Sequence, residues 1–293
     1  MVHDSSFPDG MLVRADCTKY ISELEDNSID MMITSPPYFM GKEYDQSMSV
    51  DDFAECIRLL QSKIMTKIKD GGAVCWQVGS HLSRGVLTPL DVLVYNVCSE
   101  FPELKLRNKI VWTFDHGTHA RNRLSGRHEY VLWFSKGEPT HFDLDPIRVP
   151  QKYPGKRHYK GPNKGEYSGN PKGKNPGDVW SIPNVKARHV EKTEHPCQFP
   201  VALASRLIGA LTPHDGLVFD PFAGVFTTAI AALERQRRFL CIEKDSQYFL
   251  MGEERVKAWY DGTLRVRCDE PVATPDPKRS VAIRPAHFTA ETA

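Results

Sequence analysis

Four residues that could do chemistry on an amino group follow an apolar run near the start of the chain. The run spans residues 29–34, and Ser35, Pro36, Pro37 and Tyr38 come directly after it. A hydroxyl group and a backbone carbonyl held rigid by the prolines could accept both hydrogens of an aromatic amino group, which frees the nitrogen lone pair for attack. Tyr38 could stack on a base that has rotated out of a helix. A structural Pro-Pro turn with a packing tyrosine would give the same sequence.

A second turn, around residue 222, has the pattern of a nucleoside-binding loop. The strand-like run 217–220 ends at Asp220, and the turn that follows contains Gly224 before a helical stretch begins. The glycine would let the backbone approach a ligand closely, and Glu243, at the end of the next strand, could accept hydrogen bonds from ribose hydroxyls. A phosphate-binding lysine and a complete G-x-G-x-x-G are both missing from the loop, so a dinucleotide or ATP is less well supported as its ligand.

A basic stretch without hydrophobic periodicity lies between the two turns. Residues 151–192 contain ten lysines and arginines against three acidic residues, an excess of seven, although the whole chain carries a net charge of only +1. Such a local excess favours contact with a polyanion, and Tyr153, Tyr159, Tyr167 or Trp180 could stack or pack against sugars. A solvated linker would have a similar composition.

The elements that must position these turns alternate between strands and helices, which is typical of a doubly wound α/β sheet with mostly parallel pairing. Open sheets of this kind bind ligands at the carboxyl ends of their strands, where Ser35 stands. The turn 70–72 is expected to close the longest early helix. We predict strands at 12–15, 29–34, 73–78, 109–114, 129–134, 217–220 and 238–243, and helices at 16–24, 50–68, 89–98, 199–211, 227–235 and 248–260.

Composition places the chain among ordinary globular proteins. Its 293 residues, 40% hydrophobic and 26% charged, suffice for one sizeable core and a smaller module. The sequence shows neither an apolar run of membrane-spanning length nor a secretory signal, and its seven scattered cysteines form no C-x-x-C pair, so we expect a cytoplasmic protein with free thiols. His116 and His119 have no cysteine or carboxylate at ligand spacing, so we predict no metal site.

Together, the two turns resemble the amino-methylating DNA methyltransferases of the beta class, in which the catalytic motif precedes the cofactor motif. The resemblance covers nearly the whole chain. It implies a Rossmann-like methyltransferase sheet with an inserted DNA-recognition region. Further segments that match the family in order are Asp16 after a strand, the turn 70–72, the late strand 128–136 and the segment 195–200.

The resemblance implies transfer of a methyl group from S-adenosylmethionine to the exocyclic amino nitrogen of a flipped base in double-stranded DNA. Ser35, Pro36, Pro37 and Tyr38 would form the catalytic motif. The residues assigned to the cofactor are Asp16, Thr34, His195, Cys197, Gln198, Phe199, Asp220, Pro221, Phe222, Ala223, Gly224, Thr227, Glu243 and Lys244. Those assigned to DNA are Arg121, Arg123, Arg127, Lys152, Lys156, Arg157, Lys160, Lys164, Lys172 and Lys174.

The type of base is indicated by one residue. In the resembled family, serine before Pro-Pro-Tyr goes more often with cytosine N4, and aspartate or asparagine with adenine N6, so Ser35 favours cytosine. Adenine N6 stays the first alternative. Methylation of RNA or of a protein amide is a second, and a DNA-binding protein that keeps the fold without activity is a third. A cognate restriction endonuclease and a second copy of the chain are the protein partners that the family suggests.

The resemblance also divides the chain and exposes one departure from the family. Residues 1–138 would form the catalytic half, 139–192 the target-recognition region, 193–266 the cofactor-binding half and 267–293 a flexible tail.

The family loop usually continues with a second glycine where this chain has Phe226. We expect that side chain to narrow the cofactor pocket or redirect the backbone, and so to weaken cofactor binding.

Overall fold

The computed structural model describes residues 3–37, 49–83, 85–115, 117, 119–186, 189–267 and 283. These residues fall into two units. The larger comprises residues 1–142 and 178–268, and the smaller comprises 143–177 and 269–293. Tyr38, His116 and nearly all of the predicted flexible tail lie outside the described residues.

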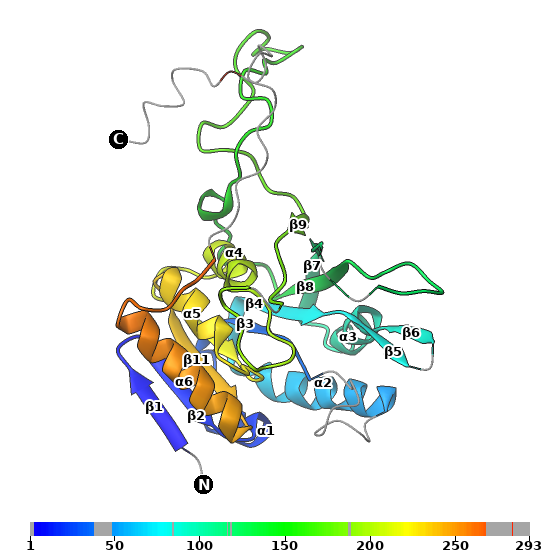
Figure 1. Cartoon of the computed structure of the whole chain (residues 1–293). Helices are drawn as coiled ribbons and strands as arrows, with labels where there is room; N and C mark the ends of the chain where they lie inside the picture. The colour runs from blue at the N-terminus through cyan, green and yellow to red at the C-terminus, as the bar shows by residue number, and fades with distance from the viewer. Residues whose placement is uncertain are drawn as a thin grey trace. The chain divides into compact units, whose positions relative to one another are not determined.

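The larger unit is built on a nine-stranded sheet with the order β1-β2-β11-β10-β3-β4-β8-β7-β9 (Figure 1). Neighbours from β2 to β4 in this order pair in parallel, as do β7 and β9, whereas β1, β8 and β7 add antiparallel pairs. The arrangement confirms the predicted α/β class. The strands are β1 (His3–Phe7), β2 (Gly10–Arg14), β3 (Ile29–Thr34), β4 (Ile68–Val78), β7 (Leu104–Thr113), β8 (His128–Lys136), β9 (Val179–Ser181), β10 (Leu217–Asp220) and β11 (Arg238–Glu243).

Helices cover both faces of this sheet. On one face, α2 (Val50–Ile64) and α3 (Leu90–Cys98) share a buried cluster with alternate strand residues such as Met32. The neighbouring Met31 points to the opposite face, since successive strand residues alternate. There its sulfur accepts a hydrogen bond from Thr212 at the end of α4 (Val201–Leu211). Both faces of the sheet are therefore buried.

Two further helices follow the strands that carry the cofactor motif. Helix α5 (Thr227–Glu234) comes after β10, and α6 (Ser246–Tyr260) comes after β11. The smaller elements of the larger unit are α1 (Cys17–Tyr20), η1 (Ile21–Glu23) and a hairpin of β5 (Ser80–Ser83) and β6 (Val86–Pro89). No helix among the described residues is long and apolar enough to cross a membrane.

Several predicted boundaries were wrong. The helix predicted over 50–68 ends at Ile64, and Ile68 is the first residue of β4, so the turn 70–72 lies inside a strand instead of closing a helix. Ile68 lies four residues after Ile64, which continues the helical spacing although the chain has already turned. The predicted helix 16–24 is one α-turn followed by a 3-10 turn. Strand β1, the hairpin β5–β6 and β9 were not predicted, because they lack a regular alternation of apolar residues.

The smaller unit has little regular structure among its described residues. It contains the 3-10 turn η2 (Asp145–Ile147) and two isolated bridges, Val149 with Lys174 and Arg157 with Tyr167. Asp145 forms ion pairs with Arg148 at 2.6 Å and Lys172 at 2.7 Å. Backbone bridges and exposed ion pairs therefore organise this segment, with few buried apolar side chains.

Candidate active site

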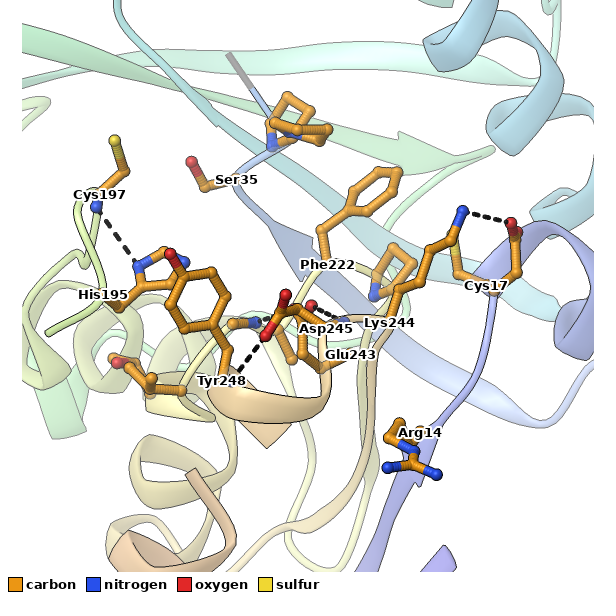
Figure 2. Close-up of a pocket in the computed structure, with 18 of the residues that line it drawn as sticks. Arg14, Cys17, Ser35, His195, Cys197, Phe222, Glu243, Lys244, Asp245 and Tyr248 are labelled. Carbon is orange, nitrogen blue, oxygen red and sulfur yellow. Dashed lines mark hydrogen bonds and ion pairs between the residues drawn. The ribbon is translucent and has the colours of Figure 1, made fainter. Parts of the chain in front are cut away.

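A cavity of about 790 Å³ opens at the carboxyl ends of β2, β3, β10 and β11 (Figure 2). Its volume lies within the range of small-molecule sites. The structure brings together at this cavity most of the residues that the sequence assigns to catalysis and to the cofactor. They are Asp16, Ser35, Pro36, Pro37, His195, Cys197, Gln198, Phe199, Pro221, Phe222, Ala223, Gly224, Thr227, Glu243 and Lys244.

Two assigned residues, Thr34 and Asp220, are absent from the cavity lining and are fully buried. Asp220 accepts hydrogen bonds from the hydroxyls of Thr34 at 2.6 Å and Thr228 at 2.5 Å, and from the backbone N–H of Phe222 at 3.1 Å. Burial raises its pKa to about 6, although these hydrogen bonds oppose the shift. One carboxyl group thus connects the end of β3, which leads into Ser35, to the loop after β10.

Glu243 is held in a fixed orientation at the end of β11. Its Oε2 accepts the N–H of Gly224 at 2.8 Å, and its Oε1 accepts the N–H of Asp245 at 2.7 Å. Burial raises its pKa to about 7, against the effect of these backbone hydrogen bonds. Each oxygen keeps a further lone pair that could accept a ligand hydroxyl.

Asp16 supplies a second acidic group to the same cavity. Its carboxylate caps α1 by accepting the N–H of Thr18 at 3.1 Å and the Thr18 hydroxyl at 2.7 Å, and it pairs with Lys244 at 3.2 Å. Burial alone would raise the pKa of Asp16, but the bonds from Thr18 and Lys244 outweigh it and lower that pKa. The carboxylate is therefore ionised at neutral pH.

The segment before α4 forms another wall. The His195 ring packs edge-on against Tyr248 with 4.5 Å between centroids, and its Nδ1 accepts the N–H of Cys197 at 3.3 Å. A β-carbon at Gly224 would lie 3.0 Å from Nε2 of His195, and Gly224 has φ +54°, so a side chain at this position would be both crowded and strained. The close approach of loop and histidine therefore depends on the glycine.

Phe226 is not among the residues that line the cavity. The ring is fully buried and packs edge-on against Phe249, with centroids 5.4 Å apart. Its backbone adopts φ 58° and ψ 38°, in the left-handed region that glycine favours. The expectation that Phe226 narrows the pocket is therefore wrong, because the side chain turns into the core.

Some residues at the cavity were missed by sequence reasoning. Tyr248 lies in the first turn of α6, where Asp245 caps the helix by accepting its N–H at 3.0 Å, so a Glu-x-Asp pattern before a helix was the available signal. Cys17 and Cys56 lie far apart in sequence and gave no signal. Burial raises the pKa of Cys17 to about 12, so its thiol stays protonated. The missed lining residues are Arg14, Ala15, Cys17, Thr18, Cys56, Val225, Asp245, Ser246 and Tyr248.

The residues assigned to DNA lie in both units. In the larger unit, Arg121 and Arg123 are exposed and Arg127 is half-buried. In the smaller unit, the guanidinium of Arg157 lies 4.0 Å from the centroid of the Tyr167 ring. All the assigned basic residues of the smaller unit are exposed, namely Lys152, Lys156, Arg157, Lys160, Lys164, Lys172 and Lys174.

One aromatic candidate is not available for stacking. Trp180 is buried in β9 opposite Trp112, and Arg206 lies 5.1 Å from its ring centroid. The suggestion that Trp180 packs against nucleic acid is therefore wrong, because the side chain is buried and Arg206 of α4 lies over its ring. Tyr159, by contrast, is 90% exposed.

Comparison with known proteins gives consistent matches. The family model N6_N4_Mtase, described as DNA methylase, matches residues 29–254. The Type II methyltransferase M.BglII of Bacillus subtilis is 39% identical over 251 residues, which is 83% of this chain and 69% of the relative. The solved structure of the PvuII DNA methyltransferase (cytosine-N4-specific) superimposes with a TM-score of 0.68 at 18% identity, covering 88% of this chain and 94% of that one. TTHA0409 from Thermus thermophilus, a putative DNA modification methylase complexed with S-adenosyl-L-methionine, superimposes with a TM-score of 0.58 at 21% identity, covering 83% and 92%.

Proposed function

The chain belongs to the N6/N4 family of DNA methylases, and we propose that it methylates cytosine at N4 in double-stranded DNA. One observation carries the proposal: the turn that begins with Ser35 lines the same cavity as Glu243 and the loop 221–224. A methyl donor bound by the loop would therefore lie next to the group that engages the base. The serine at the first position of the turn supports cytosine over adenine.

The cofactor is S-adenosylmethionine, and the residues at the cavity fit it. Glu243, with both oxygens oriented by backbone N–H groups, would accept hydrogen bonds from the ribose hydroxyls. Gly224 leaves room for a ligand to approach the loop backbone. His195 and Gln198 would contact the methionine part. When bound, S-adenosylmethionine supplies its methyl group as an electrophile.

The residues after β3 would activate the amino group. The Ser35 hydroxyl and a backbone carbonyl of the turn each accept one amino hydrogen, which draws the nitrogen toward a tetrahedral geometry and localises its lone pair. Pro36 and Pro37 fix φ and hold this carbonyl in place. The N–H proton that is acidified during the transfer leaves to water or through the Ser35 hydroxyl, so the chemistry requires no external base.

The exposed basic residues of the segment 143–177 support contact with the DNA backbone. Lysines and arginines there would neutralise phosphates, while Tyr159 is exposed and open to sugar or base contact. Arg121 and Arg123 would add to the phosphate contacts from the larger unit. Tyr38, which lies outside the described residues, is assigned to stacking on the flipped base.

Nucleoside analysis tests the choice of base. DNA incubated with the full chain and methyl-labelled S-adenosylmethionine would be digested to nucleosides and analysed by mass spectrometry. We expect label in N4-methyldeoxycytidine. Label only in N6-methyldeoxyadenosine would exclude the cytosine assignment and leave the family intact. A chain that binds DNA but transfers no label would support the inactive DNA-binding protein instead.

A further inference from the structure

The cofactor loop passes through a left-handed residue that is not glycine. Phe226 takes φ 58° and ψ 38°, which is disfavoured for residues with a β-carbon. Its position depends on α6, because a β-carbon at Gly252 would lie 2.4 Å from Cδ2 of Phe226 and 2.9 Å from the carbonyl carbon of Val225. The loop is thus shaped by the helix behind it and not only by groups that face the cavity.

Arg255, on the same helix, holds the carbonyl group that precedes Phe226. Its Nη1 donates to the carbonyl oxygen of Val225 and, at 3.3 Å, to Oγ1 of Thr227. The side chain is 7% exposed, and burial lowers its pKa to about 10, so the guanidinium stays charged at neutral pH. Hydrogen bonds from a charged donor are stronger than neutral ones. Arg255 therefore fixes two residues that line the cavity.

The charge of Glu191, in the segment before α4, opposes the effect of burial on the pKa of Arg255. Glu191 is 4% exposed, and its carboxylate accepts the N–H of Val201 at 2.9 Å and of Arg267 at 3.0 Å. Its backbone carbonyl accepts Nε2 of Gln198 at 2.9 Å. Since Gln198 lines the cavity, Glu191 orders the segment that forms this wall.

We propose that Arg255 is a positioning residue in the binding of S-adenosylmethionine. Arg255 holds the loop around Phe226 in the conformation that binds the cofactor. Arg255 does not line the cavity, so its action runs through the Val225 carbonyl and the Thr227 hydroxyl. The negative charge of Glu191 favours the charged form of Arg255. The inference rests on the proposed placement of the cofactor in this cavity. It is independent of the base that is methylated.

Calorimetry with S-adenosylmethionine tests the proposal. We expect Arg255→Leu to raise the dissociation constant by about tenfold, because a buried charged hydrogen bond is lost. Arg255→Lys, which keeps one charged donor, should raise it by a few-fold only. The KM for DNA should stay within about twofold of the native value in both variants, since the loop of Val225 and Thr227 faces the cofactor.

A second arginine separates positioning from simple loss of stability. Arg237 donates to the backbone carbonyls of Thr212, at 2.8 and 3.1 Å, and of Arg235, at 2.6 Å, and it does not line the cavity. Arg237→Leu should lower the melting temperature without changing the dissociation constant for S-adenosylmethionine.

Three results would overturn the proposal: an unchanged dissociation constant in Arg255→Leu, an equal rise in Arg237→Leu, or an equal rise in the KM for DNA. If Arg255→Leu does not fold, Arg255→Lys decides, and native-like affinity in that variant overturns the proposal. Glu243→Ala distinguishes the proposed site from the inference. Unchanged affinity in both Glu243→Ala and Arg255→Leu places the cofactor outside the cavity, whereas unchanged affinity in Arg255→Leu alone removes only the role of Arg255.

Discussion

The cavity at the carboxyl ends of the strands and the basic segment 143–177 are specified in different ways. Behind the cavity wall, buried groups such as Asp220 and Arg255 each hydrogen-bond to two or more residues in or next to the loops that line it. In the basic segment the charged side chains are exposed, and isolated bridges carry most of the order. The comparison shows that catalytic and cofactor-binding residues need buried hydrogen bonds to fix their positions. Binding of a long polyanion needs only exposed basic side chains.

The largest effect is expected at Glu243. Glu243→Ala should raise the dissociation constant for S-adenosylmethionine by about a hundredfold, because two hydrogen bonds to the ribose hydroxyls are lost. Isothermal calorimetry measures it. Glu234→Ala, an exposed glutamate at the end of α5, is the matched control and should bind normally. Equal affinity of Glu243→Ala and the native chain would show that S-adenosylmethionine does not bind in this cavity.

A smaller effect, of a different kind, is expected in the basic segment. Replacing Lys152, Lys156 and Lys160 by alanine should weaken DNA binding and reduce the salt slope by about one for each phosphate that is no longer neutralised. Affinity for S-adenosylmethionine should not change. Lys257→Ala, at an exposed position on α6, serves as the control. A salt slope that matches the native one would remove this segment from the DNA interface.

The buried carboxyl group of Asp220 makes the free energy of unfolding of the chain depend on pH. Its pKa is about 6 in the folded chain, above the ordinary value of 3.8, so the folded state binds its proton more tightly than the unfolded state. The stabilisation by this proton is complete below about pH 4 and is lost as the pH rises through 6. The loss corresponds to about 3 kcal/mol.

Denaturant unfolding of Asp220→Asn at several pH values checks this. The variant should lack the native fall in unfolding free energy between pH 4 and 6 that Asp220 contributes, since asparagine does not titrate. Equal pH slopes for the two chains would contradict the assignment of the shift to Asp220.

The smallest expected effect comes from a glycine behind the loop. Gly252→Ala should raise the dissociation constant for S-adenosylmethionine by about three- to tenfold, because the new methyl group pushes on Phe226 and Val225. Gly209→Ala, in α4, is the control, since its β-carbon would lie 3.4 Å from Arg235 in ordinary contact. Native affinity in Gly252→Ala would show that the loop does not need its buried ring in place.

Features that are local in the chain could be predicted from the sequence. The strand–turn–helix around Gly224 and the acid ending the next strand follow from neighbouring residues, and the structure brings Gly224 and Glu243 within a 2.8 Å hydrogen bond. The pairing of β2 with β11 could not be predicted, because the two strands are far apart in the sequence. This pairing places Arg14 opposite Glu243. Arg14 was therefore missed at the cavity.

The direction of a side chain was equally hard to predict. Phe226 stands in the cofactor loop, so the sequence suggested a ring in the pocket, but the space for it is provided by Gly252 on a later helix. Trp180 looked like a stacking residue within a basic stretch, yet its side chain is buried, with Arg206 of α4 over the ring. Both errors have one cause, which is that burial depends on partners distant in the sequence.

Single-turnover methylation by Ser35→Ala tests the central claim most directly. With S-adenosylmethionine and DNA both saturating, we expect the rate of methyl transfer to fall by about a hundredfold or more, since an acceptor that acts on the reacting amino group is removed. The dissociation constant for S-adenosylmethionine should stay within about twofold of the native value. A native rate in Ser35→Ala would contradict the claim that the turn after β3 performs the chemistry.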